Sequence, residues 1–300
     1  MSYLPARILL ATDGSTDAAL AAKAAVDLSA KMGVELHVVH VWQPAHFYPD
    51  QAIMPRSAAS FYATLEEQAR GLLEEQVRRI EAGAGSVAQA HLRSGNPAGE
   101  IISLGEELNV GLVALGSRGL GPIRRLVLGS VSEAVVHHAR FPVLVLRGGD
   151  EAWPPSRIVV GDDGSEDARR AAELAAGIGK VLGASMDIVH AYPPPAYLLS
   201  EKAQSSYSQV VADALRETGR VMQERADGLE RILGQAPHVK VRAGEPAATI
   251  LEVASEDGGP ALIAVASRGI GAVQRMMLGS VSSKVLHAAT GPVLVYPHVG

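Results

Sequence analysis

The chain has no cysteine, which excludes disulfide bonds and metal sites built from thiolates. Aromatic residues make up only 4% of the 300 residues, while hydrophobic residues make up 47%, so the core is expected to be aliphatic and rich in alanine. No apolar run approaches the roughly 20 residues that a membrane-spanning helix needs. We therefore expect a soluble protein that does not act in a membrane.

An excess of positive charge is also missing. The 27 Lys and Arg residues are outnumbered by 32 Asp and Glu residues, for a formal net charge of -5. A negative net charge does not attract nucleic acid or an anionic lipid surface, although local clusters of basic residues stay possible. At the N-terminus, only a short apolar run follows Arg7, which is not the pattern of a signal peptide. We expect a cytoplasmic protein whose partners do not include nucleic acid.

What the chain does contain is an internal repeat. With a shift of 150 residues, 17 of the 31 positions from 116 to 146 are identical to their partners from 266 to 296. The segment 11–15 likewise corresponds to 161–165. Two units of about 150 residues match ordinary domain sizes. The repeat predicts two tandem domains, 1–148 and 155–300, joined by an exposed linker around Trp153.

Within each half, apolar strand patterns alternate with helical ones. We expect five strands and four helices per half. The expected strands are 7–11, 34–41, 87–92, 110–115, 142–146, 157–163, 185–190, 239–242, 261–266 and 293–296. The expected helices are 17–32, 66–81, 97–108, 131–139, a helix ending near 182, 203–233, 247–256 and 281–289. This alternation predicts an α/β fold with a parallel sheet covered on both faces. The proline-containing segment 43–59 predicts an irregular loop, either a functional lid or a mobile connection.

The most distinctive stretch is a glycine-rich turn between a strand and a helix. It contains Gly116, Gly119 and Gly129, and a second copy runs from 266 to 280. Glycines at such a turn let the backbone approach a ligand and adopt positive φ, and a helix N-terminus behind them attracts anions. Ser130 is expected to cap the helix, with Glu133 completing a capping box. Phosphate is the expected ligand of this turn. The alternative is a well-capped turn that binds no ligand.

Ligands of open parallel sheets sit beyond the carboxyl ends of the strands, where the strand order reverses. If the first strand lies beside the fourth, Asp13 and the Gly116 loop face one crevice. The segment 177–181 lacks the hydroxyl residue of a nucleotide-binding P-loop. His137 and His138 are adjacent and have no acidic partner at ligand spacing, so we expect no metal site.

The spacing of the glycines resembles the signature of the universal stress protein family, in the subgroup that binds ATP. That signature has Gly, two residues, Gly, nine residues, Gly, and then Ser or Thr. The first half matches throughout, at Gly116, Gly119, Gly129 and Ser130. The second half matches from its second glycine onward but has Ala266 at the first position. The resemblance covers both halves nearly end to end.

The resemblance implies two Rossmann-like sheets of strand order 3-2-1-4-5, each with an ATP site whose Mg²⁺ is held by the phosphates. It places no catalytic residue. Asp13 would hold the adenosine end, and the arginines of the loops would either reach phosphate or be solvated. In the first half the implied ATP-binding residues are Thr12, Asp13, Val41, Gly116, Arg118, Gly119, Gly129, Ser130, Val131 and Ser132. In the second half they are Asp163, Ala191, Ala266, Arg268, Gly269, Gly279, Ser280, Val281 and Ser282.

These residues suggest a nucleotide-dependent regulatory module of the stress response rather than an efficient enzyme. Asp13 and Asp163 are the only well-placed acids, and both are committed to the nucleoside, while phosphoryl transfer needs a base and carboxylates for Mg²⁺. His40 and His190 end strands and are interpreted as structural. The alternatives are an interaction scaffold without nucleotide and a slow, autophosphorylating ATPase. The family also implies a homodimer and an unidentified regulatory protein partner.

Overall fold

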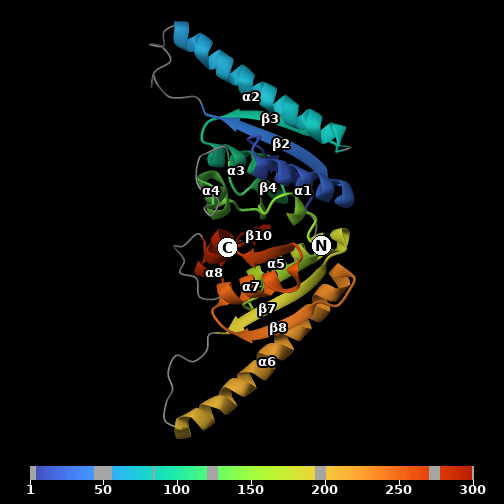
Figure 1. The fold of residues 1–300 in the computed structure, drawn as a ribbon, viewed down its shortest axis with the longest axis vertical. Helices are drawn as coiled ribbons and strands as arrows, with labels where there is room; N and C mark the ends of the chain where they lie inside the picture. The colour runs from blue at the N-terminus through green and yellow to red at the C-terminus, as the bar shows by residue number, and fades with distance from the viewer. Residues whose placement is uncertain are drawn as a thin grey trace. The chain divides into compact units, whose positions relative to one another are not determined.

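The computed structural model of the protein describes residues 5–43, 56–83, 85–119, 128–192, 201–269 and 278–298. The chain divides into two compact units, Pro5–Trp153 and Pro154–Gly300, here called the first and the second unit (Figure 1). Each unit is a parallel sheet with helices on both faces, as the sequence predicts.

The sheets have the strand order that the family resemblance implies. In the first unit the order is β3-β2-β1-β4-β5, and in the second it is β8-β7-β6-β9-β10, so both units follow 3-2-1-4-5. The strands of the first unit are β1 (Arg7–Ala11), β2 (Glu35–Trp42), β3 (Gln89–Ser94), β4 (Leu112–Gly116) and β5 (Val143–Leu146). Those of the second are β6 (Arg157–Gly161), β7 (Ser185–Tyr192), β8 (His238–Ala243), β9 (Ala261–Ala266) and β10 (Val293–Tyr296).

Four α-helices in the described part of each unit connect these strands. In the first unit they are α1 (Thr16–Met32), α2 (Arg56–Ala82), α3 (Pro97–Glu107) and α4 (Ser130–His138). In the second they are α5 (Glu166–Leu182), α6 (Glu201–Leu233), α7 (Pro246–Ser255) and α8 (Ser280–Ala288). Helix α1 packs against α2, and α3 packs against α4.

The first helix of each unit has strong signals at both ends. Ser15 Oγ accepts a hydrogen bond from the backbone N–H of Ala18 at 3.2 Å, which caps the start of α1. Gly33 ends the same helix in the left-handed conformation, with φ 67°. Ser165 and Gly183 repeat this arrangement at the ends of α5. These local signals explain why both helices end where the sequence predicts.

The core of each unit is aliphatic, as the composition predicts. The strand beside β1 in the first unit, β4, is buried from Leu112 to Leu115, and all four residues of β5 are buried. Helix α1 presents alanines to the sheet, including Ala21, Ala24 and Ala25, none of which is exposed. Small side chains let the helix axis approach the strands closely, which brings its N-terminus near the end of β4.

Two expectations from the sequence are wrong. Helix α2 begins at Arg56, about three turns before the expected start, so residues 56–59 are helical rather than irregular. The rest of the expected loop, 44–55, lies outside the described residues. The linker is not exposed throughout, because Trp153 is only 2% exposed and its Nε1 donates to Asp27 Oδ2 on α1 at 3.1 Å.

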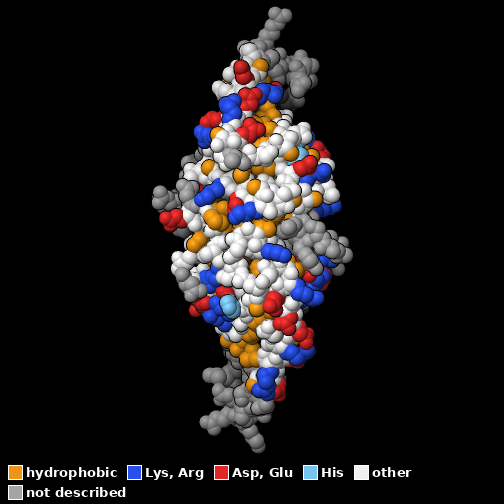
Figure 2. All heavy atoms as spheres, turned by 90° about the vertical axis from the view of Figure 1, so that its right-hand side faces the viewer, with side chains coloured by type: hydrophobic (Ala, Val, Ile, Leu, Met, Phe, Trp, Pro, Cys, Tyr) orange, Lys and Arg blue, Asp and Glu red, His pale blue; other side chains and the backbone are white. Residues whose placement is uncertain are grey.

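The surface carries both signs of charge. On the face shown in Figure 2, Lys and Arg side chains alternate with Asp and Glu side chains. In the part of the chain that the structure describes, no helix is both long and apolar enough to cross a membrane.

Candidate functional site

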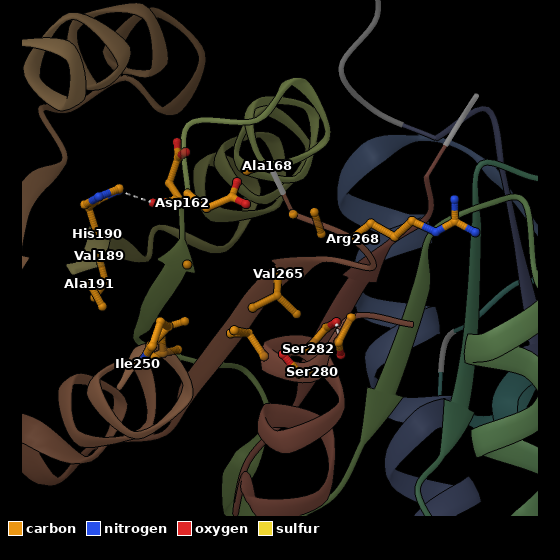
Figure 3. Close-up of a pocket in the computed structure, with 17 residues that line it drawn as sticks. Asp162, Ala168, Val189, His190, Ala191, Ile250, Val265, Arg268, Ser280 and Ser282 are labelled. Carbon is orange, nitrogen blue, oxygen red and sulfur yellow. Dashed lines mark hydrogen bonds between the residues drawn. The ribbon is translucent and has the colours of Figure 1, made fainter. Parts of the chain in front are cut away.

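Each unit has a cavity at the carboxyl end of its central strands. Strand β1 lies beside β4, with Ile8 opposite Leu112, so the predicted crevice forms at the point where the strand order reverses. The cavity has a volume of about 380 Å³ in the first unit and about 490 Å³ in the second (Figure 3). All ten residues predicted for the first site line the first cavity, and all nine predicted for the second line the other.

One wall of the cavity is the end of the second strand. The backbone N–H of Thr12, just after β1, donates to Val39 O of β2 at 2.9 Å. Residues along a strand direct their peptide groups alternately to the two sides. Val41 therefore directs its N–H and C=O toward the side where β1 has already ended. Asp162, Val189 and Ala191 repeat this arrangement in the second unit, so each cavity has a peptide edge of the kind that pairs with a planar base.

A carboxylate marks the turn after the first strand. Asp13 Oδ1 accepts from the backbone N–H of Ser15 at 3.0 Å, which fixes the side chain at the head of α1. Asp163 makes the same 3.0 Å bond with Ser165. A Cβ added at Gly119 would lie 2.3 Å from Asp13 Oδ2. The carboxylate is thus packed directly against the glycine loop, and no other side chain fits there without displacing it.

The glycines of the loop are needed for space and not for positive φ. None of Gly116, Gly119 and Gly129 is among the described glycines with positive φ, so the expectation of a left-handed backbone is wrong at these positions. A Cβ at Gly116 would lie 2.6 Å from the carbonyl carbon of Asp17 on α1. The missing side chain at position 116 therefore makes room for the first turn of α1, rather than for a ligand.

The N-terminus of the fourth helix faces the cavity without a side-chain cap. Gly129 is the N-cap of α4 and makes no side-chain cap bond, so the expectation that Ser130 caps this helix with Glu133 is wrong. The N–H of Gly129 donates to Ser117 O at 2.7 Å, which holds the glycine at the cap position. Gly279 takes the same place before α8. A helix start whose N-cap residue makes no side-chain cap bond is a candidate site for an anion.

The serines that follow have two different roles. Ser130 and Ser280 are exposed at the helix starts. Ser132 is buried, and its hydroxyl donates to Gly116 O at 2.8 Å, while Ser282 donates to Ser267 O at 3.0 Å. Each buried serine fastens its helix to the strand end opposite and so holds the loop in place.

The arginines of the two loops are not aimed at the cavities. Arg118 donates to both carboxylate oxygens of Asp17, from Nε at 3.1 Å and from Nη2 at 3.3 Å. In the second unit, His298 contacts the corresponding Asp167 through Nδ1. Figure 3 shows that the guanidinium of Arg268 extends away from the other labelled side chains. Phosphate recognition in this geometry would rely on backbone N–H groups rather than on guanidinium groups.

The strand-end histidines are bonded to the turn after the first strand. His40 Nδ1 lies 2.8 Å from Thr12 O, and His190 Nδ1 lies 2.8 Å from Asp162 O (Figure 3). Because a carbonyl only accepts, Nδ1 carries the proton in both rings. This geometry supports the structural interpretation, although His190 also lines its cavity.

An ion pair beside the second cavity was not predicted from the sequence. The carboxylate of Asp162 is buried and accepts from Nη1 of Arg225 on α6 at 2.9 and 3.0 Å. Arg225 Nη2 also donates to Gly164 O at 2.5 Å. Burial raises the pKa of Asp162, against the opposing effects of the Gly164 N–H and of Arg225. In the first unit, Thr12 replaces the aspartate.

Further lining residues come from the third helix of each unit. Pro97 and Ile101 of α3 line the first cavity, and Pro246 and Ile250 of α7 line the second. The repeated segments 95–98 and 244–247 were a sequence signal for the two prolines, because the segments match between the halves. Gln43 also lines the first cavity and has no such signal.

Comparison with known proteins finds one family in both halves. The model of the universal stress protein family matches residues 6–147 and again 155–297. A universal stress protein of Mycolicibacterium smegmatis is 29% identical over 307 residues, covering 96% of both chains. One from Mycobacterium tuberculosis is 30% identical over 308 residues, covering 96% of this chain and 94% of that one.

A solved structure matches the chain over nearly its full length. The crystal structure of a universal stress protein from Archaeoglobus fulgidus matches with a TM-score of 0.67 and 27% identity. The match covers 97% of this chain and 98% of that chain.

Proposed function

Because the chain belongs to the universal stress protein family, with one match in each half, we propose that each unit binds ATP and that the protein is a nucleotide-dependent regulatory module. One observation carries the proposal: a single cavity in each unit collects every predicted site residue. The family alone does not carry it, since the family also contains members that do not bind ATP.

The lining of each cavity fits the parts of an adenine nucleotide. The peptide edge at Val41 suits a base, and the Asp13 carboxylate suits the hydroxyls of a ribose. The uncapped start of α4 suits phosphates. A Mg²⁺ ion would enter the site bound to those phosphates. Ala191, Asp163 and the start of α8 offer the same three features in the second unit.

Calorimetric titration of the nucleotide-free protein with Mg-ATP tests the proposal. We expect two sites per chain, because both cavities have the three features. Gly119→Val and Gly269→Val should each remove one site, since a side chain there displaces the aspartate. Val34→Ala, on a loop away from the cavities, is the matched control. No binding by the unaltered protein would favour the interaction scaffold instead.

The two single-site variants also compare the two sites. We expect the first unit to bind more tightly, by about fivefold, which corresponds to about 1 kcal/mol. The reason is the methyl group of Ala266, because a side chain at the matching position, Gly116, would lie against the first turn of α1. We expect this methyl group to hold the start of α5, which follows Asp163, farther from the end of β9. The backbone strain first considered is not the cause, because Gly116 does not adopt positive φ. Equal affinities in the two variants would contradict this asymmetry.

We further propose that the protein is at most a slow ATPase. In the described part of each site, the carboxylate that lines the cavity beside the glycine loop, Asp13 or Asp163, is held by the turn that follows it. Asp162, the other carboxylate among the described lining residues, is paired with Arg225, so we expect no carboxylate there to activate a nucleophile. We expect turnover below about 1 s⁻¹, the low end of ordinary enzyme rates. A phosphate-release assay at saturating Mg-ATP measures it, and faster turnover that depends on Asp13 would overturn this proposal.

A further inference from the structure

Two histidines of the first unit lie against each other on neighbouring strands. His37 of β2 and His91 of β3 have their Nδ1 and Nε2 atoms 3.1 Å apart, and their rings are stacked with centroids 5.4 Å apart. His37 is only 6% exposed. The pair is not part of the cavity lining, and nothing in the proposed function uses it.

The second unit has permanent charges at the same two positions. Asp187 takes the place of His37, because each lies opposite the third residue of the first strand of its unit. Lys240 takes the place of His91: His91 lies opposite Val39, and Lys240 lies opposite the matching Val189. Lys240 Nζ donates to Asp187 Oδ2 at 3.1 Å, and the pair is held further by Arg157 at 3.1 Å from the same carboxylate. The register thus matches a titratable pair in one unit with an ion pair in the other.

The histidine pair tolerates one added proton but not two. In the neutral pair, one ring donates an N–H to the lone pair of the other. A first added proton can sit on His37 Nε2, which lies 3.7 Å from Glu35 Oε2. A second would place two N–H groups and two positive charges face to face across 3.1 Å. The contact between the two rings is then broken, and the pairing of the two strands is weakened at this point.

The surrounding charges do not offset a second proton. Four charged groups face the pair: Arg7 from β1, Glu35 from β2, Arg93 from β3 and Glu107 from the end of α3. Arg7 pairs with Glu35 at 2.8 Å, and Arg93 pairs with Glu107. Each carboxylate is therefore already matched by a guanidinium. Burial is the largest effect that lowers the pKa of His91. The neighbouring His37 and Arg93 lower it further by charge repulsion.

We propose that His37 and His91 form a proton sensor that loosens β2 and β3 of the first unit in mildly acidic conditions. A histidine with a lowered folded-state pKa stabilises the fold fully above its unfolded value, near 6.5, and loses that contribution as the pH falls toward the folded value. The Asp187–Lys240 pair keeps its charges through this range. His238 Nδ1 lies 3.5 Å from Asp187 Oδ1, so a proton there meets an opposite charge rather than a like one, and acid does not loosen the second unit.

The sensor is connected to the cavity through β2. Side chains two residues apart share a face of a strand, so His37, Val39 and Val41 lie on one face, and the last two line the cavity. Resting on the proposed function, this connection makes nucleotide bind less tightly to the first unit in acid. The second site keeps its affinity.

Hydrogen exchange of the full chain without nucleotide tests the sensor directly. Exchange is followed by mass spectrometry between pH 7.5 and 5.5 and corrected for the intrinsic pH dependence. We expect the opening equilibrium of residues 37–42 and 89–94 to rise by up to about tenfold per pH unit below about 6.5, the limit for one proton. Residues 187–192 and 238–243 are the internal control and should stay flat.

Two variants decide whether the histidines cause the effect. H37D/H91K copies the ion pair of the second unit and should abolish the pH dependence. His91→Gln removes the second proton site and should do the same, so it serves if the double variant does not fold. His138→Gln removes an exposed histidine of α4 and should change nothing. Equal responses of both units, or a response that survives His91→Gln, would overturn the proposal whether or not ATP binds.

Discussion

Replacing Arg225 with leucine is expected to lower the free energy of unfolding of the second unit by about 3–5 kcal/mol, because it leaves a buried carboxylate without its partner. The carboxylate of Asp162 is 0% exposed, and Arg225 is the side chain that donates to both of its oxygens. The same arginine holds the turn after β6 through the carbonyl groups of Gly164 and Ser165. The loss should therefore reach the turn that carries Asp163.

The first unit suggests the compensating change. There, Thr12 stands at the position of Asp162, and Leu72 of α2 lies beside Gly14 as Arg225 lies beside Gly164. D162T/R225L copies this arrangement and should recover most of the lost stability, since no unpaired charge is buried. An exposed arginine on the same helix, Arg220, is the control; Arg220→Leu should cost less than about 1 kcal/mol.

The pH dependence of the single variant has a definite sign. Burial raises the pKa of Asp162, and Arg225 opposes that rise. Without the arginine, the folded-state pKa rises further above the unfolded value, so the folded state binds the proton more readily. The deficit of Arg225→Leu should shrink as the pH falls from 7 toward 5. A deficit that stays constant would show that Asp162 is not the group left unpaired.

The measurement must separate the two units. Both tryptophans, Trp42 and Trp153, lie in the first unit, so their fluorescence follows only that unit during urea unfolding. Hydrogen exchange in β6 and β7 follows the second. Arg225→Leu should change exchange in the second unit while the fluorescence transition stays in place.

Replacing Gly116 with alanine is expected to destabilise the first unit by about 1–3 kcal/mol, the usual cost of overpacking. The new methyl group would lie 2.6 Å from the carbonyl carbon of Asp17 and 2.7 Å from the N of Ala18. These are backbone atoms, so no rotamer change relieves the contact. The start of α1 has to move, which also strains the bond from Ser117 Oγ to Asp17 Oδ2, 2.6 Å long.

Tryptophan fluorescence suits this variant, because Trp153 is bonded to Asp27 of α1. The midpoint of urea unfolding should fall in Gly116→Ala without a change in slope. The matched control is the reverse exchange in the second unit, Ala266→Gly, which should leave the fluorescence midpoint in place. Its cost, read from hydrogen exchange in β6 and β7, should be at most about 1 kcal/mol. If Gly116→Ala unfolds like the unaltered protein, the close approach of α1 does not explain the glycine.

Much of the architecture followed from local patterns. The tandem repeat, the ends of α1 and α5, and the strands β1, β9 and β10 are set by side chains close in sequence, such as the caps at Ser15 and Gly33. The crevice followed from strand order, and the motif residues were expected to meet there because parallel strands end at one edge. Family membership could be inferred from the spacing of the glycines, because that spacing is local in the sequence and occurs in both halves.

Contacts between residues distant in sequence could not be predicted in this way. Nothing near Gly116 indicates that α1 fills the space beside it, and nothing near Asp162 indicates Arg225, 63 residues away. Serine is a common N-cap residue, yet Ser130 is not the N-cap of α4. The hydrogen bond from the N–H of Gly129 to Ser117 O places the glycine at the N-cap position.

By itself, the sequence determined two α/β units, because periodicity and turn chemistry act within a few residues. Its resemblance to a known family implied the strand order and the residues that gather at each crevice. Only the tertiary structure decided why the glycines are needed, which carboxylate is paired and how His37 meets His91. Those outcomes depend on which side chains of separate elements come within bonding distance, and the packing of strands and helices alone sets that distance.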